Sequence, residues 1–405
     1  MFAYRACLVA CALAVPIGGY ASDWEASLDM RLQSSSGEKS FLDGGLGELR
    51  FAEERSALQL GRARFALSQP IGEVFSLKLD ASAWGEDDKN PVDLTEAYLE
   101  YRPYPRGGFR ARVKVGAFYP AISLENRAAG WESPCTISSS ALNTWLAEEL
   151  RAIGVEGSLE WLGTRMGRSF DFGVGAGIYG WNDPLGVVVA SHGFALHDRQ
   201  TGLFGRVGQP DAPVPGAEPF LSDIDGRPGY YIGGEARYLD RAVIRAMHYD
   251  NRGDPTAHSP SFDTYAWETR FDTAGVRLES GSGWTAIVQW LDGETYITPF
   301  GFELEWEFDT SYALLSRRHG PHTFSVRYDD FKVESNLPLR ESEQHGHAWT
   351  AAYVFEHGPH WRCTLEWIRL ESSLYSRAIY LGQSPFQTES KIELAIRYAL
   401  SSRDR

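Results

Sequence analysis

Apolar and polar residues alternate along much of this chain, which is the pattern of β-strands with one apolar face. In the segment 109–119, FRARVKVGAFY, every second side chain is apolar and those between are mostly charged. The segment 302–309, FELEWEFD, alternates in the same way. The pattern predicts sixteen strands, at 24–33, 57–68, 74–84, 94–103, 109–119, 151–162, 169–180, 230–238, 242–250, 265–279, 284–295, 302–317, 323–333, 347–356, 361–370 and 391–400.

The connections between these predicted strands alternate in length. Every second connection is short and rich in Gly and Pro, as in RPYPRGG and ESGSGW, and those between are longer, with 296–301 as the exception. Transmembrane β-barrels have short periplasmic turns and long outer loops. The sequence therefore predicts an all-β fold, an antiparallel transmembrane barrel of about sixteen strands with both termini on the periplasmic side.

Two connections are long enough to hold structure of their own. In the third long loop, 120–150, Leu142, Trp145 and Leu146 follow a Ser138–Ser140 cap at helical spacing. We expect this partly helical loop to fold into the lumen. The loop 181–229 folds inward as a second constriction, caps the barrel mouth or adds a hairpin. The residues expected at the constriction are Glu125, Arg127, Glu132, Trp145, Glu148 and Glu149.

The N-terminus predicts export. Residues 1–21 combine Arg5, an apolar run and a Gly-Tyr-Ala end, as in a secretory signal peptide. Leu8–Cys11 also fits a lipoprotein cleavage pattern, but the apolar stretch before Cys11 is short. We expect a signal peptide at 1–21 and a single barrel domain at 22–405, in the outer membrane of a Gram-negative bacterium.

Composition excludes several classes of protein. A mean hydropathy of −0.32 excludes a bundle of transmembrane helices. The net charge of −15 becomes −16 once residues 1–21, with their single arginine, are removed, and such a chain is poorly suited to bind nucleic acid. Tryptophans can form belts at the membrane surface or pack in a soluble core. We favour the belt for Trp24, Trp84, Trp161, Trp284, Trp290, Trp361 and Trp367.

The sequence gives little support for an enzyme or a cofactor. It lacks a Gly-x-Ser-x-Gly elbow and an HExxH zinc motif. The sequence HGPH occurs at 319–322 and 357–360 and could bind a metal, but Gly and Pro favour a tight turn. Cys135 and Cys363, the two cysteines after residue 21, are not expected to form a disulfide. We predict no catalytic residues, no metal and no cofactor.

Strand parity predicts which charged residues line the pore, if the apolar face of each strand contacts lipid. Two arcs of opposite charge would then face one another across the lumen and set its ion selectivity. In the alternative, these charges only keep the lumen wet. The predicted basic arc is Arg62, Arg64, Lys78, Arg102, Arg110, Arg112 and Lys114, and the predicted acidic arc is Glu303, Glu305, Glu307 and Asp309.

The segment GAFYPAISLEN (116–126) resembles the strand-to-loop junction of the phosphate-selective porin (O and P) family of bacterial outer-membrane porins. The resemblance implies a water-filled channel, commonly trimeric, that selects small anions along basic residues. The third loop departs from the basic array of that family, because it offers Arg127 against Glu125, Glu132, Glu148 and Glu149.

Taken together, these patterns predict an outer-membrane porin for the passive diffusion of small polar or anionic solutes. Its expected partners are outer-membrane lipid, the solutes and, in a homotrimer, further copies of the chain. Two alternatives stay open. One is a non-transport barrel, such as an adhesin or structural protein, and the other is a soluble exported β-rich binding protein.

Overall fold

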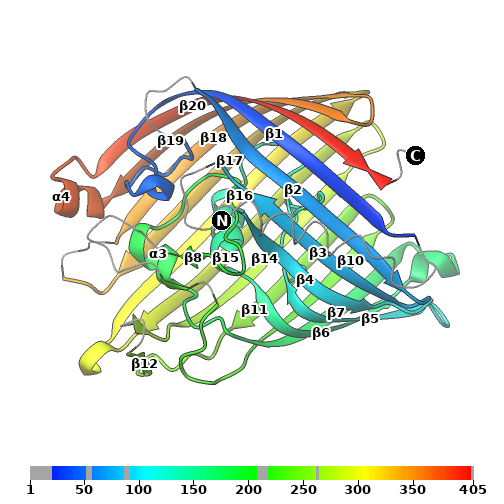
Figure 1. Cartoon of the computed structure of the whole chain (residues 1–405), viewed down its shortest axis with the longest axis horizontal. Coiled ribbons are helices and arrows are strands. Elements are labelled where there is room, and N and C mark those ends of the chain that lie inside the picture. Colours follow the sequence, from blue (N-terminus) through cyan, green and yellow to red (C-terminus); the bar gives the residue numbers. More distant parts are fainter. Residues whose placement is uncertain are drawn as a thin grey trace, which may run out of the picture.

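The barrel is closed and antiparallel throughout (Figure 1). The computed structural model describes residues 21–51, 57–85, 92–207, 218–219, 221–260, 264–338, 340 and 342–402. Within these ranges sixteen strands follow one another around the ring, and β1 pairs with β20 to close it. The strands are β1 (Asp23–Ser36), β2 (Ala57–Ile71), β3 (Phe75–Ala83), β4 (Val92–Tyr101), β5 (Phe109–Phe118), β6 (Ala152–Trp161), β7 (Phe170–Gly180), β10 (Gly229–Tyr238), β11 (Ala242–Asp250), β14 (Glu268–Glu279), β15 (Trp284–Ile297), β16 (Leu304–His319), β17 (His322–Ser335), β18 (Gln344–His357), β19 (Trp361–Leu374) and β20 (Phe386–Ser401).

All sixteen predicted strands coincide with strands of the barrel, so the predicted fold class is confirmed. The largest boundary difference is in β20, which begins at Phe386 rather than at residue 391. There the ladder continues through polar residues, with Thr388 opposite Glu371, where the alternation of apolar residues has already ended. Residues 1–20, most of the predicted signal peptide, lie outside the described residues.

Long loops gather at one end of the barrel, here the loop end, and short turns at the other, the turn end (Figure 1). The connections contain the short helices η1 (Phe41–Asp43), α2 (Ala141–Glu149), η2 (Gly163–Met166), α3 (Val187–His192), η3 (Pro299–Gly301) and α4 (Tyr375–Leu381). They also contain two small ladders, β8 (Arg206–Val207) with β9 (Glu218–Pro219) and β12 (His258–Ser259) with β13 (Thr264–Tyr265). In the described part of the chain, no helix is long and apolar enough to cross a membrane.

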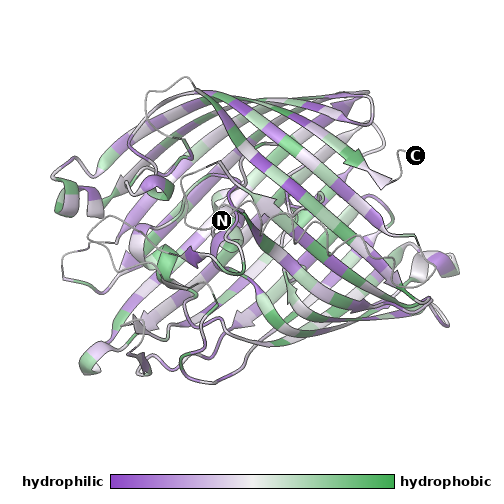
Figure 2. Cartoon of the chain, viewed as in Figure 1, coloured by the Kyte–Doolittle hydropathy of each residue, from purple (hydrophilic) through white to green (hydrophobic). Residues whose placement is uncertain are grey.

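The outer face of the barrel exposes large apolar side chains, and Figure 2 shows the alternation of polar and apolar residues along the strands. This face is what a bilayer requires of a barrel. The wall varies in height, because β3–β7, β10 and β11 have 9–11 residues and the other barrel strands have 12–16. Ten residues at about 3.3 Å each and a tilt of about 45° span about 23 Å, close to the apolar band of such barrels.

One glycine is explained by a close approach inside the wall. The register of β1 against β2 shifts between Asp29 and Met30, opposite Gly61. A Cβ on Gly61 would lie 2.4 Å from Nε of Arg31. The bulge and the glycine together let this arginine lie flat against the inner wall, where it is buried.

Candidate functional site

Two segments of the chain lie inside the lumen, and residues 126–131 of the first reach the turn end of the barrel. The first, 120–151, contains α2, in which every residue is buried. The second, 181–207, contains α3, which is buried along its whole length and contacts α2. Residues 181–207 therefore fold inward, and the short ladder β8–β9 does not join the barrel. We call the two segments the first and the second inserted segment.

Apolar packing joins the inserted segments to the wall on the side of β14–β17. The indole of Trp145 in α2 lies 5.0 Å from the ring of Phe308 on β16 and 5.3 Å from that of Phe271 on β14, between centroids. Phe194 of the second inserted segment lies 6.4 Å from the same indole. All four side chains are buried. This side of the lumen is therefore an apolar core rather than a watery wall.

The occupied region reaches around the whole circumference of the barrel. Each of the sixteen strands contributes at least one buried side chain to the lumen or its lining. Examples, in strand order, are Arg31, Arg62, Asp80, Thr95, Phe118, Ala152, Tyr179, Tyr231, Tyr249, Phe271, Leu291, Phe308, Phe331, Ala348, Leu370 and Glu389. Every strand thus carries side chains that other parts of the chain cover, and the inserted segments narrow the lumen.

Arg327 on β17 anchors the first inserted segment. Its guanidinium donates to Glu125 at 2.7 Å, to Asp329 at 2.7 Å and to the carbonyl oxygens of Ser138 and Ser139 at 2.7 and 2.9 Å. Charge-assisted bonds of this kind are stronger than neutral ones. They fix the chain just before α2, whose first amide, that of Ala141, donates to Asp329.

Ser140 begins α2 as its N-cap, with the hydroxyl accepting from the Asn143 amide at 3.3 Å. Glu366 on β19 accepts from the amides of Ile137 and Ser138 at 2.7 and 3.1 Å. These bonds satisfy backbone groups that the buried segment would otherwise leave unpaired. The wall and the inserted segment thus complete one another's hydrogen bonds.

Glu132 joins the same segment to the wall around the junction where β1 and β20 close the ring. Its carboxylate accepts from Arg62 on β2 at 2.8 Å and from Arg397 on β20. Burial would raise the pKa of Glu132, but Arg397 and Arg62 outweigh burial and hold this pKa at about 2. The side chain is therefore ionised at any physiological pH.

Asp198 anchors the second inserted segment in the same way. It accepts from Arg31 at 2.6 Å and from Arg50 at 2.8 Å. Burial raises the pKa of Asp198, yet the two arginines together hold it well below its usual value. On the side of β20, β1 and β2, the boundary between wall and inserted segments is thus ionic. We call this boundary the ionic seam.

Trp84 lies beside the ionic seam, and its predicted place in the outer belt is wrong. The indole is buried, and the guanidinium carbons of Arg62, Arg50 and Arg199 lie 4.8, 5.1 and 5.2 Å from its centre. Stacked guanidinium groups are attracted by the negative face of the ring. Proximity to a strand end therefore could not distinguish this inward tryptophan from exposed ones such as Trp290.

Glu149 links the two inserted segments to one another. Its carboxylate accepts from the amides of Val188 and Gly186, at 2.8 and 3.2 Å, and from the indole N–H of Trp145. Burial raises the pKa of Glu149 to about 8, although these hydrogen bonds oppose the rise. Its neighbour Glu148 lies 3.2 Å from Nε2 of His197 in the second segment, and burial raises the pKa of Glu148 well above its usual value.

The predicted basic arc lines the inner wall in part, and its charges are mostly paired. Arg62 reaches Glu132, and Arg127 of the constriction set reaches Glu279 at 3.0 Å. Lys78 donates to Ser68 at 2.7 Å, and Arg102 lies exposed just beyond β4. The remaining pairs are Arg64 with Asp80, Arg110 with Glu160, Arg112 with Glu100 and Lys114 with Glu156.

The predicted acidic arc is wrong. On β16 the buried residues are Trp306, Phe308 and Thr310, so Glu305, Glu307 and Asp309 lie on the opposite, outer face of the strand. Glu303 is exposed and precedes β16. The rule that apolar residues face lipid fails here, because the inserted segments make the lumen apolar at this level.

Two cavities at the turn end of the lumen lie partly against the first inserted segment. One, of about 610 Å³, lies against β1–β4 and includes Arg64, Lys78 and Glu96 in its lining. The other, of about 220 Å³, lies in the wall of β6, β7, β10 and β11. A narrow gap of about 20 Å³ lined by Arg31, Glu132 and Asp198 lies within the ionic seam.

The sequence analysis missed a group of acids in the loop 181–228. Carboxylate oxygens of Asp183, Asp223 and Asp225 lie within 4.8 Å of one another. Burial raises the pKa of Asp183 to about 6, and the other two acids add to the rise. In the described part of the chain, the histidines of the HGPH turns form no such group. Cys135 and Cys363 are free in the structure.

A closed ring of sixteen strands with two segments inside its lumen is the fold of a porin-like barrel. The outer-membrane channel DcaP of Acinetobacter baumannii matches with a TM-score of 0.54 at 9% identity, over 94% of this chain and 96% of that one. The anion-selective porin of Comamonas acidovorans matches with a TM-score of 0.50 at 12% identity, over 94% and 99%.

A trimer form of OmpT, an outer membrane protein of Vibrio cholerae, matches with a TM-score of 0.51 at 9% identity, over 94% of this chain and 99% of that one. No family model and no curated protein matches the sequence. At these identities the likeness shows the fold alone. It does not extend to the phosphate-selective family in particular.

Proposed function

We propose that this chain is a gated channel in the outer membrane of a Gram-negative bacterium, through which small polar or anionic solutes pass. The apolar outer face suits a lipid bilayer, and the charged side chains of the inner wall hold water in the lumen. Residues 1–21 would direct export and be removed. In this proposal the two inserted segments are the gate, and the conformation described is the closed one.

The ionic seam is the observation that carries this proposal. Between Trp145 and β14–β17 the contact is apolar, so water has no path there. Along the seam the contact consists of Glu132 and Asp198 with arginines, above the 610 Å³ cavity and around the 20 Å³ gap. Water molecules and solute ions can take the place of a partner in such an ion pair, whereas they cannot enter an apolar core without losing their hydration. A passage would therefore open along β20, β1 and β2, where the arginines favour anions.

Planar-bilayer recording of a chain that lacks residues 132–146 tests this function. The deletion removes Glu132 and most of α2, and single-channel conductance should rise above that of the full chain. A control deletion removes residues 255–264 from the loop after β11 and keeps Asn251 and Trp267, which hydrogen-bond to the second inserted segment. An unchanged conductance in the 132–146 deletion would remove the first inserted segment from the gate.

A homotrimer is part of the proposal. The short wall consists of β3–β7, β10 and β11 and spans little more than the apolar band. Other copies of the chain can therefore cover its outer face without burying polar strand ends. Mass measurement in detergent should give three copies, and Val174→Lys on that wall should give single chains. Val326→Lys on the tall wall is the control. Single chains from the wild type would contradict the trimer.

The buried segments that narrow the lumen favour a second candidate, a barrel without transport whose outer loops bind a partner. The two candidates differ in one observable. A channel conducts ions when its gate is loosened, whereas a structural barrel or adhesin conducts in no variant. The prediction that the chain is not an enzyme stays a prediction under both.

A further inference from the structure

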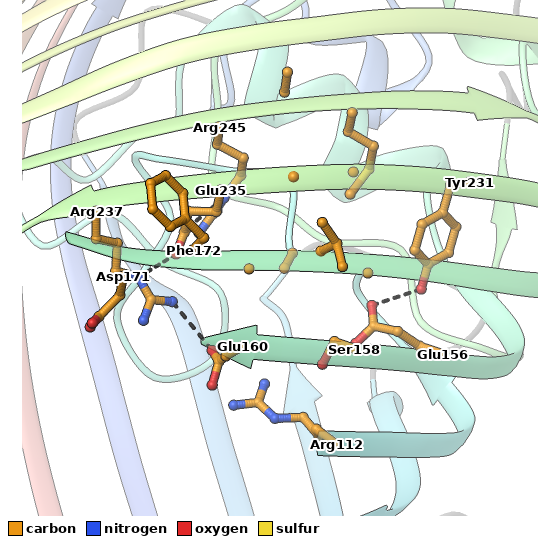
Figure 3. Close-up of a pocket in the computed structure, with 18 residues that line it drawn as sticks. Arg112, Glu156, Ser158, Glu160, Asp171, Phe172, Tyr231, Glu235, Arg237 and Arg245 are labelled. Carbon is orange, nitrogen blue, oxygen red and sulfur yellow. Dashed lines mark hydrogen bonds and ion pairs between the residues drawn. The ribbon is translucent and has the colours of Figure 1, made fainter. Parts of the chain in front are cut away.

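A recess in the inner wall lies at the turn end, beneath the inserted segments. It has a volume of about 220 Å³ and is formed by β6, β7, β10 and β11 together with Arg112 of β5 and Ala121 of the first inserted segment. Figure 3 shows Glu156, Ser158 and Glu160 along β6 with Arg112 below them, and Tyr231 reaching across to Glu156. The recess lies apart from the ionic seam, and the first inserted segment borders it through Ala121 and Ser123.

The floor of the recess is bare because β7 has glycine at three successive inward positions. An added Cβ on Gly177 would lie 2.4 Å from the ring of Tyr231, so packing within the chain explains this glycine. On Gly173 the nearest atom would be Cγ of Glu160 at 3.7 Å, and on Gly175 it would be Cβ of Ser158 at 3.5 Å. Neither of these two positions is short of space.

Backbone conformation does not explain Gly173 and Gly175 either. Both pair in continuous register with the strands on either side, and neither has a positive φ. Glycine inside a regular strand weakens it and often marks a place where a ligand approaches the backbone closely. Since no part of the described chain fills the space over them, the glycines point to a molecule that does.

The polar side chains around this floor balance one another. Arg245 donates to Glu235 at 2.9 Å and to the carbonyl of Ser123 at 2.7 Å. Arg237 lies 3.5 Å from Glu160, and the hydroxyl of Tyr231 donates to Glu156 at 2.8 Å. Three carboxylates therefore face three guanidinium groups, counting Arg112.

The remaining charges near the recess balance as well. Asp171 also lines the recess and accepts from the amide and hydroxyl of Thr164 at 2.8 and 2.9 Å. Three further charges pair with lining residues, namely Lys114 with Glu156, Arg110 with Glu160 and Glu100 with Arg112, so that five acids face five bases in all. A positively or negatively charged solute would therefore gain little electrostatic binding energy here, because groups of its own charge also line the recess.

We propose that the recess binds one uncharged, polyhydroxylated solute of monosaccharide size. A hydroxyl group both donates and accepts, so neighbouring hydroxyls match alternating carboxylates and guanidinium groups, each of which has bonding capacity beyond its ion pair. The volume is below the roughly 300 Å³ at which pockets for drug-sized ligands begin. The proposal deepens the proposed function, on which it rests only for the route by which the solute arrives.

Equilibrium binding to the purified full chain in detergent tests the recess without any measurement of transport. The probes are D-glucose, cationic D-glucosamine and anionic D-glucuronate, titrated by calorimetry. Glucose should bind, and both charged analogues should bind at least tenfold more weakly. Gly175→Val fills the recess and should weaken glucose at least tenfold. Gly157→Val is the matched control, because its side chain would meet no atom within 4 Å on the outer face of β6.

Each outcome decides between the claims. Glucose binding that Gly175→Val abolishes and Gly157→Val preserves supports the recess, even if bilayers show no conductance and the channel fails. No glucose binding to a conducting wild type overturns the recess and leaves the channel standing. Tighter binding of glucuronate or glucosamine than of glucose also overturns it. Should Gly175→Val not fold, Arg112→Met removes a donor without filling space and must weaken glucose at least threefold.

Discussion

Trp145 and Phe308 lie with their ring centroids 5.0 Å apart, one on a helix inside the barrel and the other on its wall. The contact shows why the wall is apolar toward the lumen at this height. Both rings are buried, and Phe271 and Phe194 complete the cluster around the indole. The inserted segments therefore behave as the core of a small globular domain enclosed by a sheet.

Replacing Trp145 by Ala should loosen the first inserted segment. Removing a buried indole leaves a cavity and loses about 3–5 kcal/mol of packing. We expect protease cleavage within 120–151 in a barrel that still resists heat and detergent. Trp349→Ala, on the outer face of β18, is the control and should leave the segment protected. Equal protection in both variants would contradict the cluster as an anchor.

Arg327→Met should be among the most destabilising substitutions in the wall. It leaves Glu125 and Asp329 buried without their cation, which costs about 3–5 kcal/mol. The free energy of unfolding in urea, measured in detergent, should fall by that amount. Arg318→Met breaks the exposed pair with Glu356 and should cost about 0–1 kcal/mol. Similar losses in the two variants would show that Arg327 bears no buried charge network.

The contact between the two inserted segments should weaken as pH rises. The pKa of Glu149 is about 8 in the folded chain and about 4.3 in an unfolded one. Between these values the folded state holds the extra proton, so the stability of the contact falls with rising pH and levels off above pH 8. Open time in bilayers should increase from pH 5 to pH 9. Glu149→Gln should reduce that change to the part that its neighbour Glu148 contributes, and an unaltered pH profile in this variant would exclude Glu149.

Ion selectivity should depend on the charges of the inner wall and not on those of the outer face. Changing Arg110, Arg112 and Lys114 to Glu should move the reversal potential in a salt gradient toward cations, because these residues line the lumen below the gate. Changing Glu303, Glu305 and Glu307 to Lys should leave it unmoved, because their charges lie outside. A shift of the reversal potential in the second variant alone would show that the acidic face of β16 points into the lumen.

The sequence predicted the strands well, because alternation and loop length are local properties. It failed on the facing of β16. FELEWEFD alternates correctly, but the choice of inner face depends on what fills the lumen, which only the tertiary structure determines. The prediction that Trp84 lies in the outer belt failed for the same reason, because arginines from distant parts of the chain surround the indole.

The anchors of the inserted segments were missed, although one clue was present. Arg327 and Asp329 share a face of β17 with Phe331 and Val333, and all four are buried. A charged pair on the same face as large apolar residues indicates partners that arrive from elsewhere in the chain. The predicted basic arc left out those partners, such as Glu132 for Arg62 and Glu156 for Lys114.

Single-channel recording of Glu132→Gln/Asp198→Asn tests the central claim, that the ionic seam holds the gate closed. The substitutions keep the shape of both side chains and remove the charges that bind Arg62, Arg397, Arg31 and Arg50. The account predicts a wild type that is mostly closed and a double variant whose open time rises at least tenfold. Asp254→Asn, in an outer loop, should match the wild type. A folded double variant that stays closed would contradict the account.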